Sequence, residues 1–364
     1  LGEGKKKLAN QYFSMLVTIA AIGGFVLSVL SFIFMRRIVM AFGAAGDLID
    51  YCTLYGRISC ISLTAFMLQN VFQSFFVAAG KPQLGLKVIV AAGCTNIVLD
   101  ALFIGVLHFG IAGAAFATMT SEFIGGLLPV VYLFRKNDSL LHFVKPVFDR
   151  RVFLKTCTNG SSELMTNLSM SLVNALYNLQ LMKIAGENGV AAYGAVMYVN
   201  FIFVATFLGY AIGCAPVISY HYGAGNHAEL KNLYKKSMSI ILVWGVILFG
   251  AAQLLAPVLS KIFVGYNTGL YAMTLHGFRV YAIAFLIIGI NIFGSSFFTA
   301  LNNGLISAVI SFLRTLVFQV IMVLTLPLWF GINGIWSAIS IAEALTLIMT
   351  TTFFVRQKDK YHYL

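Results

Sequence analysis

Residues 1–10 read LGEGKKKLAN, and residues 222–232 read YGAGNHAELKN. In both stretches a Gly-x-Gly precedes a short polar segment, and a long apolar run follows. Alignment of the second half of the chain on the first at this offset of 221 residues, with one-residue slips in loops, brings further residues together in the same order. The paired residues are Arg57 with Arg279, Phe75 and Phe76 with Phe297 and Phe298, Phe109 with Phe330, Glu122 with Glu343, and Arg135 with Arg356. The chain therefore contains an internal duplication.

The composition identifies the solvent around the chain as lipid. Of the 364 residues, 60% are hydrophobic and 10% are charged, and the mean hydropathy is +0.90. A soluble domain carries about 25% charged residues, so this chain has too few charges to cover a water-exposed surface. A helix needs about 20 apolar residues to cross ~30 Å of hydrocarbon. The sequence predicts an all-α polytopic membrane protein with ten spans, at 12–35, 52–79, 84–107, 111–134, 156–184, 190–221, 236–259, 274–300, 304–327 and 332–355.

The spacing of the duplicated spans decides how the two halves are related. Six spans separate each helix from its duplicate, and an even number makes both cross the membrane in the same direction. The halves are therefore parallel repeats, related by an axis along the membrane normal. The second half has six spans and the first has four, so we expect two further helices before Leu1 and twelve in the complete protein. The predicted parts are an amino-terminal lobe at 1–134, a cytoplasmic linker at 135–155 and a carboxy-terminal lobe at 156–364.

The basic residues indicate orientation in the membrane. The chain has 24 Lys and Arg against 12 Asp and Glu. When the loops are placed alternately on two sides, most of the basic residues fall on one side, which the positive-inside rule makes cytoplasmic. We therefore expect a multi-pass protein of the plasma (inner) membrane with both ends of this chain in the cytoplasm. The basic residues are scattered over short segments without a basic stripe of interleaved aromatics, which argues against a nucleic-acid partner.

Acidic side chains inside the spans are the first candidates for a site. An ionisable group in lipid is costly, about 2.5–3.5 kcal/mol at the helix centre by some scales, and marks a site by default. Asp100 lies one helical turn after Asn96, on the same face. The two could offer oxygen ligands to a small cation, could hold a proton, or could only clamp neighbouring helices. Asp100 falls opposite Ile321 or Met322 in the duplicate half, and this favours a site, because a packing device would recur.

A second candidate is a polar stripe on one span. Its members recur at steps of three and four, which places them on one helical face. Such a face cannot point at lipid, so it lines a cavity or packs on another polar helix. We interpret it, together with other polar positions and one aromatic, as the wall of a central substrate cavity; interhelical hydrogen bonding is the alternative. The cavity and substrate candidates are Glu163, Asn167, Asn174, Asn178, Asn291, Gln69, Gln73 and Tyr198.

Two other acids, Glu122 and Glu343, occupy equivalent positions in the two halves. Their repetition favours a structural partner role over a functional one. Arg314 lies in a span and has no duplicate, and the sequence pattern assigns it no role.

At these residues the sequence resembles the multidrug and toxic compound extrusion (MATE) family of antiporters. The resemblance runs from end to end and implies twelve helices in two six-helix lobes, V-shaped in the membrane. It also implies export of drugs or metabolites in exchange for Na⁺ or H⁺, with no cofactor beyond that coupling ion. The stretches that carry it are LGEGKKKLAN (1–10), FFVAAGKP (75–82), TNIVLDALF (95–103), FGIAGAAFAT (109–118) and APVISYHYGAGN (215–226).

The resemblance also assigns residues to the ion site. The family has an Asn-x-x-x-Asp on the fifth helix and a Thr on the sixth, which match Asn96, Asp100 and Thr118. These three residues are the predicted site for Na⁺ or for a proton. Glu163 stands where some members have an acid on the seventh helix. No acid in this chain matches the one that some members carry on the tenth helix.

Two other functions are weighed against efflux of small organic molecules. A flippase for lipid-linked sugars belongs to a related fold, but its pyrophosphate would require several Arg or Lys inside the spans, and this chain offers mainly Arg314. A membrane-embedded enzyme would need clustered acids, a metal motif or a Ser/Lys pair at membrane depth. The six histidines lie in loops or at span ends without metal-ligand spacing. We therefore expect a transporter and not an enzyme, acting as a monomer on small molecules in the bilayer.

Overall fold

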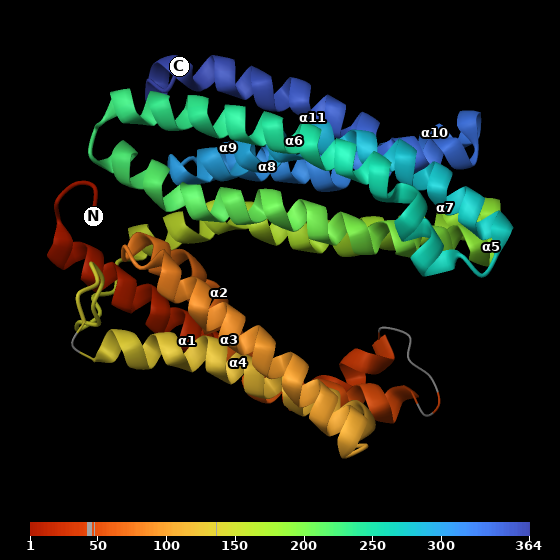
Figure 1. Ribbon diagram of the computed structural model, residues 1–364. Coiled ribbons are helices and arrows are strands. Elements are labelled where there is room, and N and C mark those ends of the chain that lie inside the picture. The colour runs from red at the N-terminus through yellow and green to blue at the C-terminus, as the bar shows by residue number, and fades with distance from the viewer. Residues whose placement is uncertain (42–45, 47, 136) are drawn as a thin grey trace. The chain divides into compact units, whose positions relative to one another are not determined.

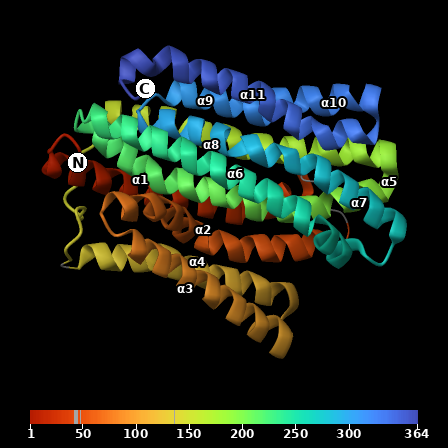
Figure 2. The same ribbon diagram turned by 45° about the horizontal axis from the view of Figure 1, so that its top comes forward.

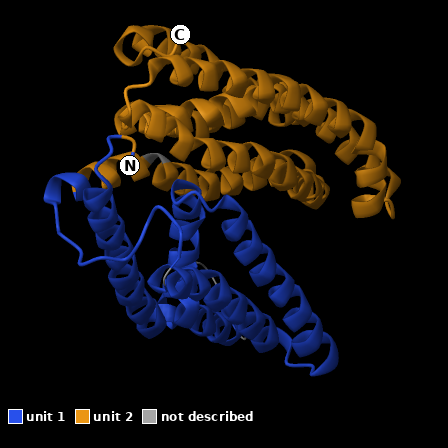
Figure 3. Cartoon of the chain, turned by 60° about the vertical axis from the view of Figure 1, so that its left-hand side comes forward, with its two compact units in different colours: residues 1, 3–153 blue, residues 2, 154–364 orange. Residues whose placement is uncertain are grey.

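The computed structural model describes residues 1–41, 46, 48–135 and 137–364, apart from the side chain of Ser162. These residues form helices and connecting segments, without a strand in the described part of the chain. They divide into two compact units, unit 1 (residues 1 and 3–153) and unit 2 (residues 2 and 154–364) (Figure 3). Of the expected linker, residues 135 and 137–153 thus group with unit 1. Residue 136 lies outside the described residues.

Unit 1 is built from four long helices (Figure 1). α2 packs against α1 and α4, and α3 packs against α4. The approach of α4 to α2 depends on Gly126, because a β-carbon there would lie 2.2 Å from the carbonyl oxygen of Ala65. The helices are α1 (Lys6–Ala41), α2 (Leu48–Ala78), α3 (Pro82–Asp100), which continues as the π-helical turn η1 (Ala101–Val106), and α4 (Gly110–Phe134).

Unit 2 is a larger bundle in which α8 is central. In the views of Figures 1 and 2, α8 lies among α6, α9 and α11, and it packs against all three. Its residues are mostly apolar and buried, as a helix surrounded by other helices requires. The elements are α5 (Arg150–Gly223), α6 (His227–Val264), α7 (Thr268–Tyr281), η2 (Ala282–Ala284), α8 (Phe285–Ala300), α9 (Gly304–Phe312), η3 (Leu313–Val317), α10 (Phe318–Phe330) and α11 (Ile332–Tyr361).

The number of membrane crossings agrees with the sequence prediction. Nine helices among the described residues are long and apolar enough to cross a membrane. One of them, α5, contains 74 residues and breaks at Gly186, where φ is 63° and ψ is −152°. A straight helix of this length would measure about 110 Å, so α5 covers two predicted spans, 156–184 and 190–221. Glycine tolerates this backbone conformation because it has no β-carbon.

The backbone explains the repeated sequence motifs. Gly4 and Gly225, the second glycines of the two Gly-x-Gly motifs, have φ of 75° and 67°. Gly110 and Gly331, in FGIAG and FGING, have φ of 56° and 55°. These positive values are costly for residues with a β-carbon. The duplicated motifs therefore mark turns that contain a positive φ at the same glycine in both halves.

The segment that follows α4 lies against α1. The backbone N–H of His142 donates to Asn10 Oδ1 at 3.0 Å, and that of Val144 donates to Ser14 Oγ at 2.9 Å. Leu141 is 3% exposed and packs in the apolar core of unit 1. The polar side chains at the start of α1 thus satisfy backbone groups of this segment and hold it to unit 1.

Asp149 joins this segment to two helices. Its Oδ1 accepts hydrogen bonds from the backbone N–H groups of Arg151, at 2.8 Å, and Val152, at 3.3 Å, at the start of α5. Its Oδ2 accepts from the Tyr12 hydroxyl of α1 at 3.1 Å. The bonds from Val152 and Arg151, followed by that from Tyr12, hold the pKa of Asp149 below its ordinary value of 3.8.

We expect Asp149→Ala to lower the midpoint of thermal unfolding at neutral pH. Because the folded state depresses this pKa, the carboxylate stabilises the fold above pH 3.8, and the stabilisation is lost as the pH falls through the lower folded value. The difference between wild type and variant should therefore shrink on acidification. Asp359→Ala, at an exposed position near the end of α11, is the control. A difference that stays constant down to the most acidic condition would contradict this account.

Candidate functional site

Asn96 and Asp100 lie near the end of α3, and the π-helical turn η1 begins directly after Asp100. Nδ2 of Asn96 and Oδ1 of Asp100 are buried and have no hydrogen-bond partner among the described residues. Buried polar atoms are usually paired, so two unpaired atoms one helical turn apart leave room for a further hydrogen-bonding group or ion. One donor and one acceptor are thus left open at this end of α3.

Thr118 stands on α4, the helix that packs against α3. Its side chain is half-buried, and its backbone carbonyl accepts a hydrogen bond from the Ser121 hydroxyl at 2.8 Å. A short turn joins the two helices, so α3 and α4 form a hairpin. Among the described residues, no hydrogen bond joins the Thr118 side chain to Asp100 or Asn96. The fold thus places the three predicted residues on two helices in contact.

The polar stripe of α5 is open at the surface of unit 2. Glu163, Asn167 and Asn174 are exposed and Asn178 is half-buried. Nδ2 of Asn167 donates to the backbone carbonyl of Glu163 at 2.8 Å. The buried face of the same helix segment carries residues at steps of four: Ser169, Val173, Tyr177 and Leu181. The first part of α5 therefore packs one face in the core of unit 2, and its exposed side carries both the polar stripe and leucines such as Leu164 and Leu168.

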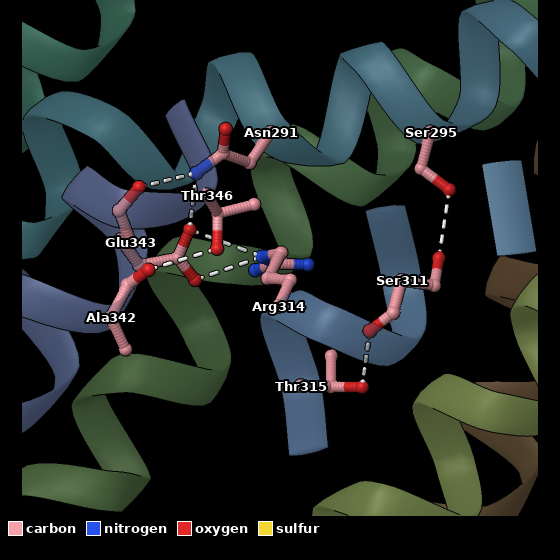
Figure 4. Close-up of polar contacts among 8 residues, drawn as sticks. All are labelled: Asn291, Ser295, Ser311, Arg314, Thr315, Ala342, Glu343 and Thr346. Atoms are coloured by element: carbon pink, nitrogen blue, oxygen red, sulfur yellow. Dashed lines mark hydrogen bonds and ion pairs between the residues drawn. The ribbon is translucent and has the colours of Figure 1, made fainter. Parts of the chain in front are cut away.

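Unit 2 also contains a buried ion pair. Nε of Arg314, in η3, donates to the carboxylate of Glu343, in α11, at 2.8 Å to Oε1 and 3.1 Å to Oε2. Nδ2 of Asn291, in α8, donates to Glu343 Oε2 at 2.7 Å and to its backbone carbonyl at 2.9 Å (Figure 4). The side chains of Glu343 and Arg314 are 1% and 14% exposed. A fixed cation and an amide thus compensate a carboxylate removed from solvent.

A chain of hydroxyl groups joins α8 to α9 beside this pair. Oγ of Ser295 lies 2.9 Å from Oγ of Ser307 and 2.8 Å from Oγ of Ser311. Thr299 Oγ1 continues the chain, 2.6 Å from Ser307 Oγ. Asn291 is fully buried and donates from Nδ2 to Glu343, while its Oδ1 atom has no hydrogen-bond partner among the described residues. This face of α8 therefore packs against α9 and α11.

The remaining predicted residues lie on α2 and α5. Gln69 and Gln73 are half-buried on α2. Gln69 lies against α4, where a β-carbon added to Gly125 would come within 2.4 Å of its Oε1 atom. Tyr198 is 66% exposed, and its ring stacks on that of Phe263 with centroids 5.8 Å apart. Glu163 and the asparagines of α5 form one face, whereas Asn291, Gln69 and Tyr198 belong to separate surroundings.

The sequence pattern did not predict the role of Arg314 as the partner of Glu343. The signal available was the presence of opposite charges, Arg314 and Glu343, on the last two predicted spans of one half. Repetition of Glu122 and Glu343 indicated a structural partner without indicating which residue that partner is. The pairing becomes evident only when the two helices are placed side by side.

The MatE family model matches residues 1–102 and 164–325. The chain belongs to this family. It is therefore a multi-pass membrane transporter, in agreement with the resemblance of its sequence to the MATE family.

Relatives and a solved structure are similar to this chain over most of its length. The multidrug export protein MepA of Staphylococcus haemolyticus (strain JCSC1435) is 24% identical over 327 residues, which cover 88% of this MatE protein and 71% of MepA. MepA of Staphylococcus aureus (strain MRSA252) is 21% identical over 343 residues, which cover 93% of this chain and 74% of that MepA. A crystal structure of MATE in complex with MaL6 matches with a TM-score of 0.94 at 22% identity. The match covers all of this chain and 82% of the chain in that structure. These structural likenesses show the fold.

Proposed function

We propose that this chain is a secondary active antiporter that exports drugs or other organic compounds, cationic and amphipathic, in exchange for Na⁺ or H⁺. Membership of the MatE family and relatives named as multidrug export proteins support this assignment. Alternating access would expose the substrate to one side of the membrane at a time. The protein would act as a monomer in the plasma membrane, with both ends of this chain in the cytoplasm. It would need no cofactor except the coupling ion.

The observation that carries the coupling proposal is the pair of open polar atoms on α3. Oδ1 of Asp100 and Nδ2 of Asn96 are buried without a partner in the part of the chain that the structure describes. A proton on the Asp100 carboxyl group, or a Na⁺ ion held by its oxygen, would satisfy the open acceptor Oδ1. Thr118 would add a second oxygen from α4. An ion that binds one conformation better than the other shifts the equilibrium between them, which is the requirement for coupling.

The substrate side of the proposal rests on the open face of α5. Glu163 is the one acid of this stripe, and the asparagines beside it offer hydrogen bonds without charge. The Arg314 guanidinium also acts on the Glu163 carboxylate, but it is already paired with Glu343. A carboxylate beside neutral polar groups suits an organic cation better than an anion. A flippase for lipid-linked pyrophosphates is less well supported, because Nε of Arg314 is already bound to Glu343.

Reconstitution into proteoliposomes tests the function directly. Substrate export should follow an imposed Na⁺ gradient or an imposed proton gradient, with the two varied separately. Substrate added on one side should in turn drive movement of the coupling ion, since coupling is reciprocal. Export that is indifferent to both gradients would contradict secondary active antiport.

Glu163→Gln should lower the export of an organic cation several-fold. The substitution keeps the size and hydrogen bonding of the side chain but removes the charge that attracts the substrate. Initial rates of cation uptake into inverted vesicles, at matched protein levels, measure the effect. Glu187→Gln, at an exposed position beside the break in α5, is the matched control and should behave as wild type. If Glu163→Gln exports the cation as fast as Glu187→Gln does, Glu163 does not belong to the substrate site.

A further inference from the structure

Three consecutive lysines, Lys5, Lys6 and Lys7, lie exposed at the start of α1. Positive side chains are unfavourable there, because the first backbone N–H groups of a helix already carry partial positive charge. Lys5 is paired with Glu3 at 2.8 Å, but neither Lys6 nor Lys7 forms a salt bridge among the described residues. The three lysines line an open hollow of about 660 Å³ together with Gly4, Leu8 and Gln11. Two uncompensated positive charges thus face this hollow.

The repeat shows that the fold does not require these lysines. The offset of 221 residues places Asn-His-Ala, residues 226–228, opposite them at the start of α6. Asn226 caps α6 in the usual way, and its Oδ1 accepts from the backbone N–H of Glu229 at 3.1 Å. Residues 226–228 are exposed although unit 2 contains the span before them, the second part of α5. In this repeat, therefore, a preceding span does not cover the position.

The segment after α4 brings further basic residues to α1. In addition to its hydrogen bonds to Asn10 and Ser14, its Phe143 ring lies 5.0 Å from the Phe13 ring of α1. Asn10 lies one helical turn after Lys6, so this segment begins its contact with α1 close to the lysines. Further along, the segment and the start of α5 carry three exposed basic side chains that form no salt bridge in the described part of the chain: Lys145, Arg150 and Arg151.

The nearby acids do not neutralise this cluster. Residues 1–15 and 141–153 contain six Lys and Arg but only two acids, Glu3 and Asp149. Glu3 is paired with Lys5. The Asp149 carboxylate accepts from the backbone N–H groups of Arg151 and Val152 and from Tyr12. Both acids are therefore already engaged, and the cluster keeps an excess of positive charge.

Exposed apolar side chains alternate with these basic residues. Val144, Val147 and Phe148 are 40%, 47% and 67% exposed, and Lys145 lies between them in sequence. Water disfavours such side chains, whereas the boundary between lipid headgroups and acyl chains accepts them. Segments that combine basic and apolar side chains in this way lie at that boundary, and anionic lipids attract them. The surface thus offers two features to one partner, positive charge and apolar contact.

We propose that the start of α1 and residues 141–151 together bind the headgroup of an anionic phospholipid. The phosphodiester would lie against Lys6 and Lys7, and Val147 and Phe148 would enter the adjacent acyl region. A soluble phosphate would use the lysines but not the apolar side chains, so the observations favour a lipid. The bound lipid would join α1 to the segment that leads into α5. This inference concerns the membrane and does not depend on the proposed antiport.

Native mass spectrometry of the purified full chain, with phosphatidylglycerol or phosphatidylcholine added to the detergent, tests the proposal. The wild type should bind phosphatidylglycerol more tightly than phosphatidylcholine. Lys6→Gln/Lys7→Gln should weaken phosphatidylglycerol binding about tenfold, because each basic residue beside an anionic lipid surface adds to the attraction. Its binding of phosphatidylcholine should not change. A wild type without preference between the two lipids would overturn the proposal and leave the lysines as an orientation signal only.

The matched control is Lys235→Gln/Lys236→Gln, which removes the same charge from exposed positions on α6. The segment that returns to α6, residues 362–364, contains no Lys or Arg, so this variant should bind phosphatidylglycerol as the wild type does. An equal loss in both double variants would show attraction by general charge and would overturn a site at α1. Excess inorganic phosphate at constant ionic strength should not displace the lipid, and displacement would identify a site for free phosphate instead.

A second variant tests the apolar part of the site without a change in charge. Val147→Ser/Phe148→Ser keeps every basic residue, and both positions are exposed, so the protein should unfold at the wild-type midpoint. Its affinity for phosphatidylglycerol should fall several-fold, because less apolar surface enters the acyl region. Wild-type affinity in this variant would show that the apolar side chains take no part in binding and would overturn the lipid assignment.

Discussion

Arg314→Met is expected to destabilise unit 2 by about 3–5 kcal/mol, the typical cost of removing one partner from a buried ion pair. The Glu343 side chain is 1% exposed, so solvent cannot replace the guanidinium group that is lost. Asn291 would still donate to Oε2 of Glu343, but one amide does not compensate a buried negative charge. The midpoint of denaturant unfolding, measured on purified protein in detergent, reports the effect.

The double variant Arg314→Met/Glu343→Gln separates loss of charge balance from loss of packing. With both charges removed, the amide introduced by Glu343→Gln can still accept from Asn291, and most of the stability should return. Arg279→Met, which removes an exposed arginine from α7, is the matched control and should change the midpoint little. If the double variant is no more stable than Arg314→Met alone, packing of the arginine and not its charge stabilises this region.

Asp100→Asn should reduce ion-driven export to near background. The amide keeps the shape of the side chain and much of its hydrogen bonding, but it neither exchanges a proton nor provides a charged oxygen for Na⁺. Ion occupancy would then no longer distinguish inward-facing from outward-facing states. Substrate binding should remain measurable, because Asp100 belongs to the ion site and not to the face of α5. Gradient-driven export in proteoliposomes and equilibrium substrate binding are the two measurements.

The matched control for Asp100→Asn is Asp50→Asn. Asp50 also belongs to unit 1, but it is exposed and lies 3.5 Å from Arg36 in a surface ion pair, which contributes little to stability. That variant should export as wild type does. Normal gradient-driven export by Asp100→Asn, at the same protein level in the membrane, would remove Asp100 as the coupling residue.

The predictions that were confirmed depend on composition and on local backbone requirements. Lipid as the solvent and membrane-spanning helices as the fold follow from the low charge content, because an unpaired backbone polar group is too costly in hydrocarbon. The duplication could be recognised because turns such as those at Gly110 and Gly331 require residues without a β-carbon. The break in α5 at Gly186 has the same local origin. Each of these features is decided within a few residues of the chain.

The partners inside each unit were decided by tertiary structure. Arg314 and Asn291 are separated from Glu343 by 29 and 52 residues along the chain, and they meet it from η3 and α8. Periodicity places residues on a common helical face, but the rotation of each helix about its axis, set by packing, decides what that face meets. Polar residues with similar helical spacing are therefore exposed at Glu163 on α5 and buried at Asn291 on α8. Composition and short-range geometry determine the spans and turns, whereas side-chain pairing requires three helices to be placed together.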